Sequence, residues 1–430
     1  MPVEWAQVMT NLATAYNQRI RGDRAENLEQ AIAAYRQALE VMTHQAMPVE
    51  WATVMMNLAT AYYSRIRGDR AENLEQAIAA YRQALEVRTR QAMPVEWAAC
   101  TMGLANAYKN RIRGDRAENL EQAIAAYRQA LEVMTHQAMP VEWATVMMNL
   151  ATAYYSRIRG DRAENLEQAI AAYRQALEVK TREAMPVEWA TVMMNLANAY
   201  KNRIRDDRAE NLEQAIAAYR QALEVRTHQA MPVEWATVMM NLASAYAARI
   251  RGDRAENLER AIAAYRQALE VRTRQAMPVE WAQAMMNLAT AYKNRIRGDR
   301  AENLEQAIAA YRQALEVRTR QAMPVEWATV MINLASAYAT RIRGERAENL
   351  EQAIAAYRQA LEVRTRQAMP VEWAAVMMNL ANAYSDRIRG DRAENLEQAI
   401  AAYRQALEVN TPAPPEPRTR APPPPGTGDL

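Results

Sequence analysis

The sequence predicts an all-α protein built as a solenoid, in which short helical hairpins stack one on the next. The first observation is an internal repeat, because the pentapeptide MPVEW recurs every 46 residues. The second is that apolar residues within each repeat recur at helical spacing. A fixed period between about 20 and 50 residues is typical of solenoids. The nine repeats begin at Met1, Met47, Met93, Met139, Met185, Met231, Met277, Met323 and Met369.

The repeats define one domain and a tail. They fill residues 1–411, and residues 412–430 follow with eight prolines. Proline lacks an N–H and fixes φ, so this composition favours an extended or disordered tail rather than a helix.

The first helix of the repeat at residues 47–92 is expected from about Val49 to Arg67. Pro48 suits a first helical turn, and Gly68 suits the position after the last turn. At about 100° per residue, one broad face collects the apolar side chains. Its members are Trp51, Val54, Met55, Leu58, Ala59, Tyr62 and Ile66.

The second helix of this repeat is expected to end near Val87. Asp69–Glu72 and Asn73–Gln76 each match a capping box, so the helix begins at one of them. One stripe is again apolar, formed by Leu74, Ala77, Ile78, Tyr81, Ala84 and Leu85. A hairpin with one apolar face per helix cannot bury those faces alone, so the repeats must stack.

The repeat resembles the tetratricopeptide repeat (TPR). Leu58-Ala59-x₂-Tyr62 and Ala77-x₃-Tyr81 match the two halves of its pattern, with Met55 in the tryptophan position. The period is longer than the usual one, as in kinesin light chains and in bacterial arrays that accompany a caspase-like CHAT protease domain. The resemblance covers residues 1–411 and implies a right-handed superhelical α-solenoid of nine helix-turn-helix repeats. No CHAT-like effector sequence is present, so protease activity does not carry over.

Composition excludes several classes of protein. The net charge of +3 gives no basis for binding nucleic acid or a membrane surface. No window approaches the ~18 consecutive apolar residues of a membrane span. A single cysteine, Cys100, excludes a disulfide framework, and the first residues do not resemble a signal peptide. We therefore expect a cytoplasmic protein.

Differences between the nine copies collect on one face of the first helix. Counting Met47 as position 1, the variable positions are 7, 10, 14, 17 and 18, opposite the apolar face. The resemblance implies that this face lines a concave ligand groove, so Thr60, Tyr63 and Tyr155 are candidate groove residues. The alternative is free drift of a solvent-facing stripe. Other exposed charges barely vary, and ion pairs between adjacent repeats could hold them constant.

Position 11 is asparagine in every repeat except the third, where it is Gly103. A carboxamide carries donors and an acceptor, so it can bond both polar groups of a peptide unit. The row predicts contact with the backbone of an extended chain. The alternative is that these side chains bond the adjacent helix and orient the stack. The row consists of Asn11, Asn57, Asn149, Asn195, Asn241, Asn287, Asn333 and Asn379.

Position 17 is lysine in three alternate repeats, each time followed by asparagine. The pairs are Lys109 and Asn110, Lys201 and Asn202, and Lys293 and Asn294. Duplication of a two-repeat block explains the spacing. Three cations along one groove nevertheless favour an acidic ligand.

The motifs point to binding rather than catalysis. There is no phosphate-binding loop, zinc spacing or nucleophile elbow, so we expect no enzyme, no metal and no cofactor. The first hypothesis is a scaffold whose partner is a protein or peptide. The second is a structural protein that forms head-to-tail homo-oligomers through uncapped terminal repeats. The third is a regulatory partner of a separate CHAT-type protease.

Overall fold

A computed structural model of the protein describes residues 2–410, and the predicted tail lies outside these residues. Within them the chain forms 18 α-helices, two per repeat, and no strand. The odd-numbered helix of each repeat is called helix A and the even-numbered one helix B. They are α1 (Pro2–Gln18), α2 (Arg24–Val41), α3 (Pro48–Ser64), α4 (Arg70–Val87), α5 (Pro94–Asn110), α6 (Arg116–Leu131), α7 (Pro140–Ser156), α8 (Arg162–Val179), α9 (Pro186–Asn202), α10 (Arg208–Val225), α11 (Pro232–Ala248), α12 (Arg254–Val271), α13 (Pro278–Asn294), α14 (Arg300–Leu315), α15 (Pro324–Ala339), α16 (Arg346–Leu361), α17 (Pro370–Ser385) and α18 (Arg392–Asn410).

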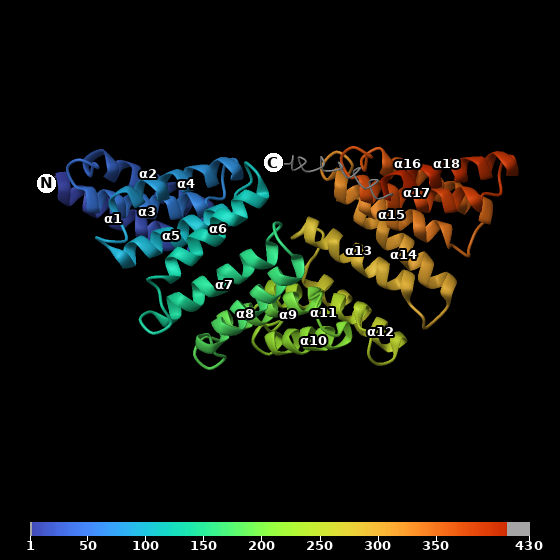
Figure 1. Ribbon diagram of the computed structural model, residues 1–430, viewed down its shortest axis with the longest axis horizontal. Helices are drawn as coiled ribbons and strands as arrows, with labels where there is room; N and C mark the ends of the chain where they lie inside the picture. Colours follow the sequence, from blue (N-terminus) through green and yellow to red (C-terminus); the bar gives the residue numbers. More distant parts are fainter. Residues whose placement is uncertain (1, 411–430) are drawn as a thin grey trace, which may run out of the picture. The chain divides into compact units, whose positions relative to one another are not determined.

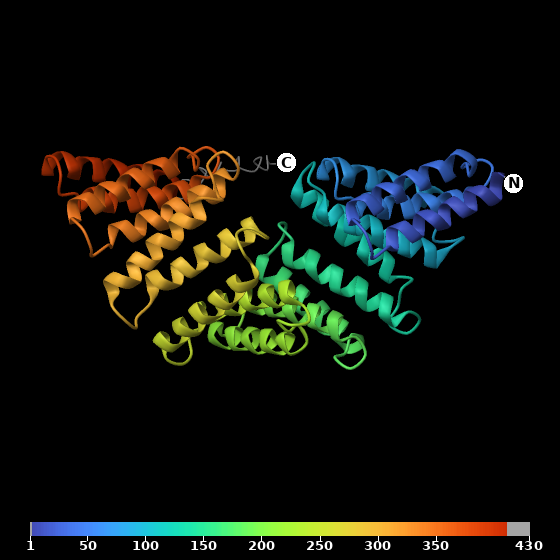
Figure 2. The same cartoon turned by 180° about the vertical axis from the view of Figure 1, so that it is seen from behind.

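The chain divides into two compact parts, Met1–Gly252 and Asp253–Leu430. In the first part, helix A packs against helix B of its own repeat, and helix B packs against helix A of the next. The second part repeats this order from α12 onward. Both views of the ribbon show the pairs α3–α4 and α15–α16, each within its own part (Figures 1 and 2). The predicted all-α fold of nine helix-turn-helix repeats is confirmed.

Helix A is shorter than predicted. It ends at Ser64, because Arg65 turns to an extended backbone (φ −57°, ψ 131°) while its N–H donates to the carbonyl of Tyr62. Ile66 therefore leaves the apolar face and is 61% exposed, so its assignment to the core was wrong. The core of the helix is otherwise as expected, with Leu58 and Tyr62 buried.

Helix B begins at the first of the two candidate caps. The Asp69 carboxylate accepts a hydrogen bond from the Glu72 N–H at 2.7 Å, which satisfies one of the donors left free in a first turn. Asn73 instead lies inside the helix and is buried. Its Nδ2 donates to the carbonyl of Arg67 at 2.9 Å and so holds the interhelical turn.

The interhelical turn needs a left-handed backbone at position 22. Eight repeats place glycine there, with φ between 78° and 85°, as at Gly160. The fifth repeat has Asp206 at φ 65°, a conformation that costs a residue with a Cβ about 1 kcal/mol or more. The Asp206 carboxylate lies 2.5 Å from Arg203, which offsets part of this strain.

We expect Asp206→Gly to raise the stability of the fifth repeat by about 0.5–1 kcal/mol, because glycine adopts positive φ without steric cost. Hydrogen exchange of the second-turn amides of α10, whose hydrogen bonds lie within the helix, measures this locally. Gly160→Asp is the matched control, and it should speed exchange at the start of α8. Equal exchange in wild type and Asp206→Gly would contradict the strain argument.

Candidate functional site

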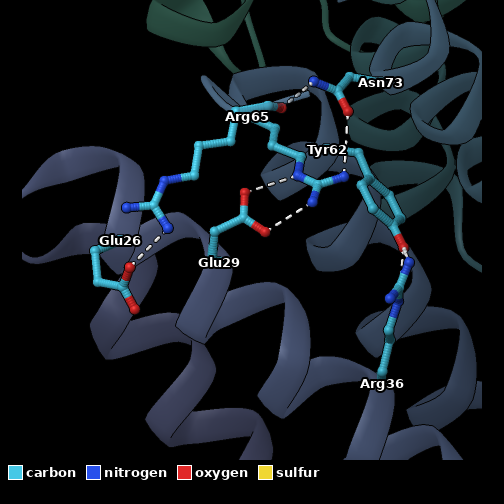
Figure 3. Close-up of polar contacts among 7 residues, drawn as sticks. Glu26, Glu29, Arg36, Tyr62, Arg65 and Asn73 are labelled. Carbon is cyan, nitrogen blue, oxygen red and sulfur yellow. Dashed lines mark hydrogen bonds and ion pairs between the residues drawn. The ribbon is translucent and has the colours of Figure 1, made fainter. Parts of the chain in front are cut away.

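The charges that do not vary between repeats connect adjacent repeats. Arg65 donates from Nε and Nη2 to the two carboxylate oxygens of Glu29, at 2.8 and 2.7 Å (Figure 3). The same bidentate Arg–Glu pair recurs at the other junctions between repeats that the structure describes within each part. The pairs are Arg111–Glu75, Arg157–Glu121, Arg203–Glu167, Arg249–Glu213, Arg295–Glu259, Arg341–Glu305 and Arg387–Glu351.

A second contact accompanies each pair. Arg36 of α2 donates from Nε and Nη2 to the Tyr62 hydroxyl of α3, at 2.9 and 2.6 Å (Figure 3). Arg65 lies across the junction from Arg36, and its Nη1 also reaches the Asn73 side chain at 3.4 Å. The expectation that ion pairs between repeats use the constant charges is therefore confirmed.

The arginines hold the pKa of their carboxyl partners below its usual value. For Glu121 the main cause is the hydrogen bond from Arg157, which outweighs the opposing effect of burial. The other seven glutamates are shifted the same way by the same cause. These carboxylates serve the junctions, so they are not available to a ligand.

The face of the A helices that carries positions 7, 10, 11, 14, 17 and 18 is called the A-face. A pocket between α3 and α5 shows that these positions face one another across adjacent repeats. It is lined by positions 10, 14, 17 and 18 of α3 and by positions 7, 10, 11 and 14 of α5, together with Tyr81.

The asparagine row lies on the A-face with little internal bonding. Asn287 accepts a hydrogen bond from Gln283 at 2.9 Å, and Asn11 accepts one from Gln7 at 3.3 Å. In residues 2–410, the structure gives the other carboxamides of the row no hydrogen-bond partner. Most of them are half-buried. The alternative interpretation requires hydrogen bonds from these side chains to the adjacent helix, and the described residues show none. They are Asn57, Asn149, Asn195, Asn241, Asn333 and Asn379.

Position 14 is tied to helix B of its own repeat. The Thr60 hydroxyl lies 2.9 Å from the Tyr81 hydroxyl and donates to the carbonyl of Met56 at 3.0 Å. Where the residue is asparagine, as at Asn106, its oxygen accepts from the Tyr127 hydroxyl at 2.6 Å. This position therefore orients a buried tyrosine, and its polar atoms are largely occupied.

Predicted residues at positions 17 and 18 meet across alternate junctions. Asn110 Nδ2 donates to the Tyr63 hydroxyl at 2.6 Å, and Asn202 makes the same bond to Tyr155 at 2.5 Å. Asn294 is exposed. The structure thus joins four of the predicted side chains in two pairs.

The three lysines at position 17 lie partly buried between neighbouring A helices. Lys293 Nζ donates to Ser336 Oγ at 3.2 Å, and Lys201 lies 3.5 Å from Ser244 Oγ. Lys109 Nζ lies 6.0 Å from the centre of the Tyr127 ring. Burial lowers the pKa of all three, and that of Lys109 falls to about 8. A carboxylate brought close to these amines would therefore stabilise their charged form.

A set of cations at position 42, at the end of helix B, was not predicted from the sequence. Arg88 is 5% exposed, yet its Nη2 donates to Thr53 Oγ1 at 2.8 Å and its Nη1 lies 3.0 Å from Met56 Sδ. The Nε atom is buried without a hydrogen-bond partner among the described residues. Lys180, Arg226 and Arg318 are buried at the same position. The sequence does contain a signal for this site, because position 42 is methionine in some repeats and arginine or lysine in others. That alternation indicates a partly apolar environment.

Other titratable residues have structural roles. Cys100 is buried, and burial raises the pKa of its thiol to about 12, which suppresses its reactivity. His44 packs edge-on against Trp51, with ring centres 4.8 Å apart. The described helices include none long and apolar enough to cross a bilayer.

The fold resembles several solved structures. The apo form of RapI superposes with a TM-score of 0.58 at 14% identity, covering 94% of this chain and 97% of that one. The apo quorum sensor NprR from B. thuringiensis gives 0.58 at 14% identity, over 95% and 98%. A Rap protein complexed with competence and sporulation factor gives 0.53 at 14% identity, over 95% and 98%. At this identity the likeness shows the fold alone.

No curated protein sequence matches the chain. A family model described as tetratricopeptide repeat matches it nine times, once per repeat. The matches are residues 5–41, 51–89, 97–133, 143–181, 189–230, 235–273, 281–319, 327–365 and 373–413. They cover most of the sequence, and the chain therefore belongs to the tetratricopeptide repeat family.

Proposed function

We propose that the chain is a non-catalytic scaffold whose A-face binds an extended segment of a protein or peptide. The observation that carries this proposal is the row of half-buried carboxamides without internal partners. A partly desolvated amide gains most from a ligand that supplies both a donor and an acceptor, and a peptide backbone does so at every residue.

Each part of the chain carries its own section of the row. In the first part the row consists of Asn11, Asn57, Asn149, Asn195 and Asn241, interrupted by Gly103. In the second part it consists of Asn287, Asn333 and Asn379. The bidentate Arg–Glu pairs hold successive A helices in a fixed relation, so the carboxamides are presented by a preorganised surface.

The cations near the A-face favour a ligand segment that carries acidic residues. Lys109 and Lys201 lie on the A-face of the first part, and Arg88 and Arg226 lie at the ends of its B helices. None of these four cations has a carboxylate within ion-pair distance in residues 2–410. A ligand carboxylate would offset the cost of their burial.

The similar structures agree with a binding role. One of the Rap proteins of this fold was solved with competence and sporulation factor bound, so the fold can hold a ligand. The identity of the ligand of this chain does not follow from that likeness.

The test is affinity capture from the source lysate with Asn149→Ala, Asn195→Ala and Asn241→Ala combined. We expect the variant to keep its helical circular dichroism spectrum and to lose at least 90% of a partner that wild type captures. The reason is the loss of three backbone-reading amides, each of which contributes about 0.5–1.5 kcal/mol. The matched control replaces the exposed helix B residues Gln129, Gln175 and Gln221 by alanine and should leave capture unchanged. Equal capture by both variants would refute the A-face as the binding surface.

Head-to-tail self-association is the second candidate, favoured by the apolar faces of α1 and α18. Leu396 and Ile400 of α18 are 37% and 39% exposed, and Trp5 and Val8 of α1 are 46% and 63% exposed. The equivalent residues of inner repeats pack against neighbours. Sedimentation of the purified chain distinguishes the candidates, because self-association predicts a mass that rises with concentration. Leu396→Asp and Ile400→Asp should then abolish the rise.

A further inference from the structure

The third repeat departs from the others within one stretch of α5. Cys100 replaces valine or alanine, Thr101 replaces methionine, and Gly103 replaces the asparagine of the row at position 11. The residue at position 7, which is threonine or glutamine in most repeats, is Ala99. Most of these changes shorten a side chain, so repeat three has lost volume at one place rather than at scattered positions.

The lost volume lies beside a buried tyrosine. A Cβ atom built on Gly103 would fall 2.7 Å from Cε1 and Cζ of the Tyr81 ring and 2.9 Å from its hydroxyl oxygen. Those separations are too short for real atoms, so the Tyr81 ring lies where it could not lie beside an asparagine. The Tyr81 ring therefore occupies part of the space that a side chain at position 11 of α5 would need. A pocket remains beside the ring on the A-face.

This pocket of about 340 Å³ lies between α3 and α5 and is called here the Gly103 pocket. Its lining includes Met56 and Tyr63 of α3, Met102 and Gly103 of α5, and the Tyr81 ring. The volume is large enough for one large side chain. Methionine side chains are flexible, so the walls can close around occupants of different shape.

Three of the polar groups at the pocket already have partners. The Tyr81 hydroxyl is paired with Thr60, and the Tyr63 hydroxyl accepts from Asn110. The oxygen of Asn106, which also lines the pocket, accepts from Tyr127. A polar occupant would have to break these bonds, whereas an apolar occupant would bury its surface against methionine and tyrosine rings.

A cation lies at the edge of the pocket. Arg88 Nη1 lies 3.0 Å from the sulfur of Met56, and its buried Nε has no hydrogen-bond partner among the described residues. The first and third repeats have Met42 and Met134 at the same position. Position 42 is arginine or lysine in six repeats, and Arg88 is the residue at this position that contacts the lining of the Gly103 pocket, through Met56.

We propose that the Gly103 pocket binds one large apolar side chain of the ligand, and that Arg88 binds a carboxylate close to it in the ligand sequence. The proposal rests on the proposed function, because it assumes that an extended segment lies on the A-face. At this position the protein would recognise a side chain of the ligand. The asparagine row, which contacts the ligand backbone, is interrupted there by Gly103.

Three fluorescein-labelled peptides test the proposal, with the sequence Gly-Ser-Glu-X-Glu-Ser-Gly and X as alanine, leucine or phenylalanine. Fluorescence anisotropy should show that wild type binds the leucine and phenylalanine peptides at least tenfold more tightly than the alanine peptide. Gly103→Asn should reduce this preference to less than threefold, because the carboxamide fills the pocket. Arg88→Met should weaken all three peptides by a similar factor and reduce the dependence of binding on salt.

Arg88→Met copies Met42 and Met134 of the first and third repeats. Gly103→Asn copies the other eight repeats but requires the Tyr81 ring to move, because the new Cβ would otherwise lie 2.7 Å from it. Thermal melts of both variants are needed to check that they fold. If wild type shows no preference among the three peptides, including no binding of any of them, the inference is overturned. An unchanged preference in Gly103→Asn overturns it as well. The proposed function is judged separately, by whether the triple asparagine variant loses its captured partner.

Discussion

Replacing Leu166 by alanine is expected to destabilise the fourth repeat by about 2–5 kcal/mol. Leu166 is 0% exposed, because α8 is covered both by α7 of its own repeat and by α9 of the next. Truncation removes apolar contacts on both sides and leaves a cavity at the junction. Each repeat contacts only its neighbours, so the loss should be greatest in α7, α8 and α9. Hydrogen exchange resolved by helix measures it, together with the melting temperature.

The matched control is Leu396→Ala in α18, at the same position of the last repeat. The flanking sequence is the same, but Leu396 is 37% exposed, because no following helix within residues 2–410 covers it. Its truncation should cost less than about 1.5 kcal/mol, in proportion to the smaller area buried. Equal effects of the two substitutions would show that the core lies within each hairpin rather than between repeats.

Acid is expected to weaken the stack over a narrow pH range. The eight junction glutamates have a folded-state pKa below the usual 4.5, chiefly because an arginine hydrogen-bonds each of them. A carboxyl whose pKa is lower in the folded state binds its proton more readily when unfolded. Its contribution to stability is therefore complete above pH 4.5 and is lost as the pH falls through the folded-state value. The melting temperature should be level near neutral pH and fall steeply below about pH 4.5.

A variant carrying Glu121→Gln and Glu167→Gln distinguishes the effect of the junction glutamates on stability from the effect of the other acidic residues. It should melt lower than wild type at pH 7, because two bidentate pairs are lost, and its melting temperature should depend less on pH between 5 and 3. Glu142→Gln and Glu188→Gln, on exposed residues in the first turns of α7 and α9, form the control and should leave the wild-type slope unchanged. An identical slope in all three proteins would rule out the junction pairs as the cause.

The fold could be predicted from the sequence because local patterns repeat nine times without conflict. Apolar spacing placed both helices, and Pro48 and Asp69 marked where they begin. The end of helix A was placed too far along, since Ile66 continues the apolar pattern although the helix stops at Ser64. Helical spacing describes a continuous helix and carries no information about the residue at which the backbone turns away.

The candidate site could be predicted only in part. The asparagine row was visible because its position in the repeat is constant. The sequence could not show that these asparagines lack internal hydrogen-bond partners, because hydrogen bonds between helices depend on how the helices are placed in space. The bond between Tyr63 and Asn110 joins residues 47 positions apart, and the contact of Arg88 with Met56 joins two helices. Gly103 could be predicted as a gap in the row, but the close approach of the Tyr81 ring to Gly103 depends on packing that sequence spacing does not describe.

Photocrosslinking of the captured partner can show whether the ligand lies on the A-face. A benzophenone side chain would replace Ser156, an exposed residue at position 18 of α7, or Gln175, an exposed residue of α8. Both variants bind the partner if the asparagines are the contact. We expect a covalent adduct from position 156 and none from position 175. An adduct from position 175 alone would contradict this expectation and place the binding surface on the B helices.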